Sequence, residues 1–90
     1  MISSTDLIAS FCRATSKVKR VNLDPKSVET DSYLGGDWGI DSMEMLEIWF
    51  HMEKENAIRL PDGAKRDVYT VGQVVEVFKR HLTTERSDPP

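Results

Sequence analysis

The sequence predicts an all-α fold: a small bundle of three main helices plus a short fourth, with a long loop between helices one and two. Three observations support this prediction. Three segments have apolar residues at helical spacing, each follows a capping signal, and no segment alternates convincingly as a strand would. Ninety residues suit one domain over 1–90. We expect it to be folded over about 3–82, with 83–90 as a polar, flexible tail.

The first helix is expected to begin at Ser3, which has capping-box spacing to Asp6. Its apolar face is formed by side chains that recur at intervals of four, three and four residues: Leu7, Phe11, Ala14 and Val18. The basic cluster "KVKR" at 17–20 closes this helix, because cations near a helix C-terminus complement its dipole.

Residues 21–40 have no sustained period and contain Pro25 and three glycines, which predicts a long loop. Long loops inside compact domains are usually functional or held by side chains that reach the core. The expected anchoring side chains are Val21, Leu23, Val28, Leu34, Trp38 and Ile40.

The second helix is expected from Asp41 or Ser42 to about Glu55, and "DSME" has the pattern of a capping box. At about 100° per residue its side chains form three groups. The core group is Met45, Ile48, Trp49 and Met52; the solvated group is Glu44, Glu47, His51, Lys54 and Glu55. Between them lies an apolar shoulder of Met43, Leu46 and Phe50. The shoulder with its neighbouring carboxylates is interpreted as a docking surface; burial of all seven apolar side chains is the alternative.

After this helix, Pro61 and Gly63 interrupt regular structure, and one small helical turn is expected near them. The last helix is predicted from the capping-box spacing of Thr70 and Gln73. Its apolar stripe consists of Val71, Val74, Val75, Phe78 and Leu82, and the basic cluster Lys79, Arg80 and His81 is expected to end it.

The charge distribution excludes several classes of function. The net charge is −3, but residues 29–55 hold eight carboxylates against one lysine, a balance of −7. This acidity disfavours a nucleic-acid partner and favours a basic protein surface. The acidic loop lacks calcium-ligand spacing, no zinc ligand set is present, and Ser42 lacks a hydrolase elbow. We therefore expect no metal site and no catalytic residue.

The cellular location is predicted from three further features of the sequence. No apolar run approaches the ~20 residues that span a membrane, and no secretory signal is recognisable at the start. The single cysteine, Cys12, is expected to be buried, and it excludes an internal disulfide. These features favour a cytoplasmic location without membrane insertion. We also expect the protein to be a monomer.

The segment "GIDSMEMLEI" resembles the attachment motif of the acyl carrier protein family. The matching residues are Gly39, Asp41, Ser42, Glu44, Leu46, Glu47 and Ile48, with Met43 as a conservative replacement for the usual leucine. The layout is also similar, since a long loop precedes the motif and "IRLPD" precedes the final helix. The resemblance covers roughly residues 3–82. The nearby "LGGDW" is similar to a peptidyl-carrier motif but has Trp38 in place of its serine. Ser42 is therefore the serine that either motif leaves for attachment of a group.

This resemblance implies a non-catalytic carrier. Ser42 would bear a 4′-phosphopantetheine arm, transferred from coenzyme A by a holo-carrier synthase, and Asp41 would help engage that synthase. The arm would present acyl thioesters to fatty acid, polyketide or related biosynthetic enzymes. Family members dock on basic partner surfaces through positions that correspond here to Met43, Glu44, Leu46 and Glu47. The apolar shoulder adds Phe50 to this docking set. Two alternatives stay open: an aminoacyl or peptidyl carrier, and an unmodified helical adaptor that binds partners through the same acidic helix.

Overall fold

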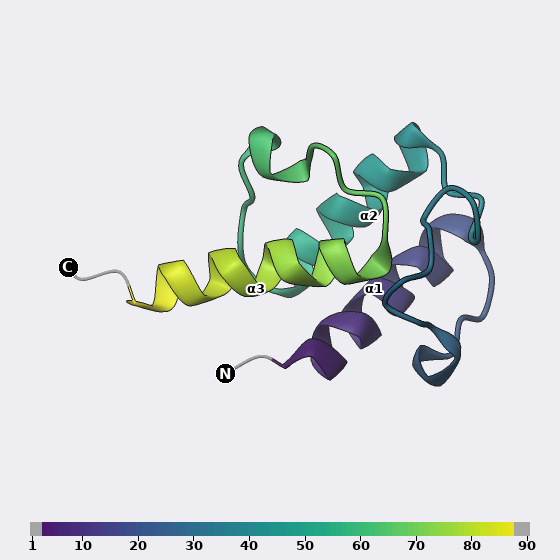
Figure 1. The fold of residues 1–90 in the computed structure, drawn as a ribbon, viewed down its shortest axis with the longest axis horizontal. Coiled ribbons are helices and arrows are strands. Elements are labelled where there is room, and N and C mark those ends of the chain that lie inside the picture. Colours follow the sequence, from purple (N-terminus) through teal and green to yellow (C-terminus); the bar gives the residue numbers. More distant parts are fainter. Residues whose placement is uncertain (1–2, 88–90) are drawn as a thin grey trace.

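The predicted all-α architecture is confirmed by the computed structural model, which describes residues 3–87 and the side chains of residues 3–82 (Figure 1). Its elements in chain order are α1 (Ser4–Lys19), η1 (Pro25–Ser27), α2 (Ser42–Glu55), η2 (Asp62–Lys65) and α3 (Val71–Ser87). Helix α1 packs against both α2 and α3. The two short elements are 3₁₀ turns, and η2 is the small helical turn expected near Pro61 and Gly63. The described residues contain no strand, only an isolated bridge between Tyr33 and Thr70.

All three predicted capping boxes form, and this explains where the helices begin. Ser3 and Asp6 exchange side-chain and backbone hydrogen bonds before α1. The side chain of Gln73 accepts from the backbone of Thr70, and Thr70 Oγ1 accepts from that of Gln73, before α3. These bonds satisfy amides that a helix start otherwise leaves unpaired.

The core lies where the apolar faces of the three long helices meet. Phe11, Ile48, Met52 and Phe78 are fully buried, and Trp49 stacks on Phe78 with ring centroids 5.8 Å apart. The stacked pair joins α2 to α3. Aromatic side chains bury the largest apolar areas, so this contact is a main source of the stability of a domain of this size.

The long loop is anchored to the core as predicted, with one exception. Val28, Leu34 and Ile40 are buried, and Leu23 and Trp38 are partly buried. Val21 is 52% exposed, so its expected anchoring role is wrong. The reason is local: Arg20 ends α1 in a left-handed conformation, with a φ of 56°. The chain turns there, so that Val21 faces solvent and Leu23 packs inward.

Backbone hydrogen bonds fix the end of this loop against the start of α3. The amide of Leu34 donates to the backbone carbonyl of Tyr69 at 2.8 Å, and the amide of Gly72 donates to the backbone carbonyl of Thr30 at 2.7 Å. A Cβ at Gly72 would lie 2.9 Å from the Thr30 carbonyl oxygen, closer than such contacts allow. Only glycine permits this approach, which holds the segment leading to α2 in place.

The end of α3 differs from the prediction. The helix was expected to end at Lys79–His81, but it continues to Ser87. No glycine or proline occurs between Gly72 and Pro89, so nothing in the sequence breaks the helical backbone there. Part of the expected tail, 88–90, lies outside the described residues.

Candidate functional site

Ser42 is the first residue of α2, and the capping box predicted around it forms. Asp41 is the N-cap: its carboxylate accepts from the amide of Glu44 at 2.8 Å, and the Glu44 carboxylate accepts from the amide of Asp41 at 3.0 Å. Ser42 itself is exposed, and within the described residues its hydroxyl has no hydrogen-bond partner. The hydroxyl therefore stands at a fixed, accessible helix start, where aligned amide dipoles favour an attached anion.

A lysine from the end of α1 fixes the backbone just before this serine. Lys19 Nζ donates to the Gly39 carbonyl at 2.9 Å and to both Glu44 carboxylate oxygens at 3.0 and 3.1 Å. Gly39 has a φ of 64°, a left-handed conformation that glycine adopts without strain. This role of Lys19 was not predicted, because no spacing rule links Lys19 to Glu44, which is 25 positions away in the sequence.

The interaction with Lys19 corrects one prediction about α2. Glu44 was placed in the solvated group, but its side chain is only 25% exposed and is engaged by Lys19 and by the capping box. The physical reason is that α1 packs along this side of α2. Glu55, in the same predicted group, is likewise bound by Arg13 of α1 at 2.7 Å. His51 is partly buried, whereas Glu47 and Lys54 are exposed as expected.

The apolar shoulder is exposed, which excludes the alternative that all seven apolar side chains of this helix are buried. Met43, Leu46 and Phe50 are 71%, 60% and 61% exposed. The core group behaves as predicted, since Ile48, Trp49 and Met52 are buried and Met45 is partly buried. Three large apolar side chains in solvent within two helical turns form the kind of patch that marks an interaction surface.

A groove of about 440 Å³ begins beside Ser42 and is mostly apolar. Its lining residues come from the end of the long loop, the start of α2 and the segment before α3: Tyr33, Leu34, Gly35, Gly36, Ile40, Asp41, Ser42, Met45, Val68 and Tyr69. A hydrogen bond from the Tyr69 hydroxyl to Asp67, at 3.1 Å, raises the pKa of this phenol above its usual value. Neither tyrosine was predicted, because their segments are joined by tertiary backbone contacts that no local sequence pattern indicates.

Cys12, the free cysteine of the described chain, is buried. Burial raises the pKa of the Cys12 thiol, which disfavours the reactive thiolate. Among residues 3–87, no group of three or more His, Cys, Asp or Glu side chains could hold a metal ion. In the same range, no helix has the length and apolar composition needed to cross a membrane.

An exposed serine at a capped helix start, within a small three-helix domain, agrees with the fold and the motif that the resemblance to acyl carrier proteins implies. Comparison with known proteins agrees. The chain is 33% identical over 62 residues to the acyl carrier protein of Wolinella succinogenes, covering 69% of this chain and 82% of the relative. It is 31% identical over 65 residues to that of Amoebophilus asiaticus, covering 72% and 81%. It is 26% identical over 65 residues to that of Porphyromonas gingivalis, covering 72% and 83%.

No family model matches the chain. The similarity to the curated relatives is nevertheless sufficient, in both identity and coverage, and the chain belongs to the acyl carrier protein family.

Proposed function

We propose that this protein carries acyl groups on a 4′-phosphopantetheine arm attached to Ser42. One observation supports this assignment most strongly: the Ser42 hydroxyl is exposed and without a partner among the described residues, at the capped start of a 14-residue helix. A hydroxyl with these properties can join a phosphodiester without loss of any packing or hydrogen bond. The same helix start stabilises the phosphate that the attachment introduces.

The residues around Ser42 fit such a group. Asp41 and Glu44 hold the helix start, and Lys19 holds the preceding backbone, so the attachment point has a fixed direction. The groove between Tyr33 and Tyr69 offers apolar contact for a chain that leaves Ser42. The arm supplies the chemistry, since its terminal thiol binds the acyl group as a thioester. The protein supplies position and recognition, and acts as a carrier rather than as a catalyst.

The proposed partners are a holo-carrier synthase, which attaches the arm, and enzymes that load and transfer acyl groups. Asp41, next to the attachment serine, is proposed to contact the synthase. Exposure of Met43, Leu46, Phe50 and Glu47 supports their role in docking. Glu44 contributes as a capping residue of α2 and as the ion-pair partner of Lys19. A cytoplasmic location stays a prediction from the single cysteine.

The test is a modification assay read by intact mass. The purified chain is incubated with coenzyme A and a broad-specificity phosphopantetheinyl transferase, alongside Ser42→Ala and the control Ser27→Ala. Ser27 is exposed on η1 and makes no side-chain hydrogen bond among the described residues. Wild type and Ser27→Ala should gain one phosphopantetheine and Ser42→Ala none, with equal circular dichroism for all three. An unmodified wild type would favour the adaptor, and an equal gain by Ser42→Ala would refute attachment at Ser42.

A further inference from the structure

The carboxylates of α2 are mostly engaged within the molecule. Of the four on this helix, Glu44 binds Lys19, Glu53 binds Lys65 at 3.2 Å, and Glu55 binds Arg13. Glu53 also accepts from the amide of Leu60 at 2.6 Å. Within the described residues, Glu47 is the carboxylate of α2 that has no ion pair. Three of the eight carboxylates of residues 29–55 are therefore already paired within the molecule before a partner arrives.

The outward side of α2 carries opposite charges at its two ends. Glu47 and Lys54 are seven residues apart, so they lie on the same side of the helix and roughly 10 Å apart along its axis. Both are exposed. The apolar shoulder of Met43, Leu46 and Phe50 lies beside them. Asp41 adds a second exposed carboxylate at the Ser42 end.

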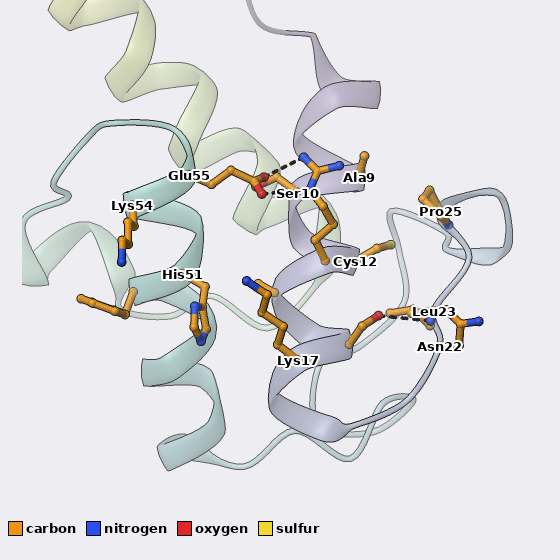
Figure 2. A pocket seen from close by; sticks show the side chains of 14 residues that line it. Ala9, Ser10, Cys12, Lys17, Asn22, Leu23, Pro25, His51, Lys54 and Glu55 are labelled. Carbon is orange, nitrogen blue, oxygen red and sulfur yellow. Dashed lines mark hydrogen bonds and ion pairs between the residues drawn. The ribbon is translucent and has the colours of Figure 1, made fainter.

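A groove between α1 and α2 extends the basic end of this surface. It has a volume of about 630 Å³, and both Phe50 and Lys54 line it. Figure 2 shows Lys17 on α1 and His51 and Lys54 on α2 among the side chains around it. Arg13 is bound by Glu55 there at 2.7 Å. Within the described part of the chain, Lys17 and Lys54 have no ion pair, so the groove has a surplus of positive charge.

We propose that the docking surface of α2 is polarised, with Glu47 and Asp41 at the Ser42 end and Lys54 and Lys17 at the far end. The partner that fits is a protein with an apolar patch for the shoulder, a basic residue near the attachment serine and a carboxylate at the far end. A uniformly basic partner surface meets Lys54 and Lys17 as like charges, which disfavours it. This inference rests on the proposed carrier function and identifies which partners the carrier accepts.

The first test uses a phosphopantetheinyl transferase whose carrier-docking surface is uniformly basic, and measures kcat/KM for arm transfer at low salt. Lys54→Glu should raise kcat/KM by roughly threefold to tenfold, and Glu47→Lys should lower it by a similar factor. The control is Arg66→Glu, because Arg66 is exposed and lines neither of the two grooves described above. The proposal would be overturned if Lys54→Glu left kcat/KM unchanged, or if Lys54→Glu and Arg66→Glu raised kcat/KM equally.

The second test introduces, on the docking surface of the transferase, the carboxylate that the proposal expects opposite Lys54. Basic residues of its docking surface are replaced one at a time by aspartate, and each variant is assayed with wild-type carrier and with Lys54→Glu. At one position the replacement should improve transfer to wild type and impair transfer to Lys54→Glu, and this coupling should weaken with added salt. Absence of coupling at every position refutes the polarised surface.

Two other outcomes are distinguishable from these. If no carrier variant is modified at all, the proposed attachment at Ser42 fails rather than the polarity of the docking surface. If the chain associates with itself in a concentration-dependent way that Lys54→Glu abolishes, the basic end binds the acidic end of a second copy. Sedimentation velocity of the unmodified chain measures this, and a monomer at all concentrations supports an external partner.

Discussion

The side of α2 that faces α1 and the side that faces solvent use the same residue types for different purposes. Glu44 and Glu47 are one turn apart, yet Glu44 is held by Lys19 and the capping box while Glu47 is exposed and unpaired within the described chain. Trp49 is 3% exposed, and its neighbour Phe50 is 61% exposed. The contrast teaches that position relative to α1 and α3 decides whether a residue of α2 stabilises the fold or remains available to a partner.

The largest effect expected from this comparison is on the free energy of unfolding of two adjacent aromatic variants. Trp49→Ala removes the ring stacked on Phe78 and leaves a cavity, which should cost about 3–5 kcal/mol. Phe50→Ala removes an exposed ring and should change stability by no more than about 0.5 kcal/mol. Urea unfolding followed by circular dichroism measures both. Similar losses for the two variants would show that the two sides of α2 are not distinct.

A smaller difference is expected between the two glutamates. Glu44→Ala removes a capping-box partner and the carboxylate that binds Lys19, and should cost about 1–2 kcal/mol. Glu47→Ala should stay within roughly 0.5 kcal/mol of wild type, since its side chain has no partner in the described chain. The same unfolding assay compares them.

Lys19→Met tests the interaction from the other helix. Combined with Glu44→Ala, it should cost less than the two single changes together, because both remove the same contact. Strict additivity would show that the ion pair contributes nothing to holding the start of α2.

Local signals were the part of this structure that the sequence predicted well. The capping boxes, the apolar stripes and the exposed shoulder depend on spacings of three and four residues within one helix, which the sequence displays directly. The Ser42 site was found for the same reason, since Asp41, Ser42 and Glu44 are consecutive or nearly so. The exposure of Val21 depended on one left-handed residue, Arg20, that no pattern indicated.

Contacts between distant segments were the part that could not be predicted. Lys19 with Glu44, Arg13 with Glu55 and Lys65 with Glu53 join residues 12 to 42 positions apart. Which exposed-looking carboxylate finds a cation depends on how the helices pack, and a helical projection of α2 alone contains no information about α1. The count of acidic residues was therefore a poor guide to the charge that a partner meets.

The smallest expected effect concerns Glu55, at the far end of the same inner side. Hydrogen bonds from Arg13 hold the pKa of this carboxyl below its usual value. A pKa lowered by folding means that the folded state gains stability from the ionised form above the unfolded pKa, and loses it as the pH falls through the folded pKa. Glu55→Gln removes this contribution, so the difference in unfolding free energy from wild type should shrink as the pH falls from about 5 to about 3.

The Arg13 and Glu55 side chains are 59% and 39% exposed, so solvent screening keeps the difference at neutral pH below about 1 kcal/mol. High salt should reduce it further. Glu47→Gln is the matched control and should show no such pH dependence, because Glu47 has no ion pair among the described residues. Equal pH dependence in the two variants would mean that Arg13 does not distinguish Glu55 from an unpaired carboxylate, and that the ion pair adds no stability at this end of α2.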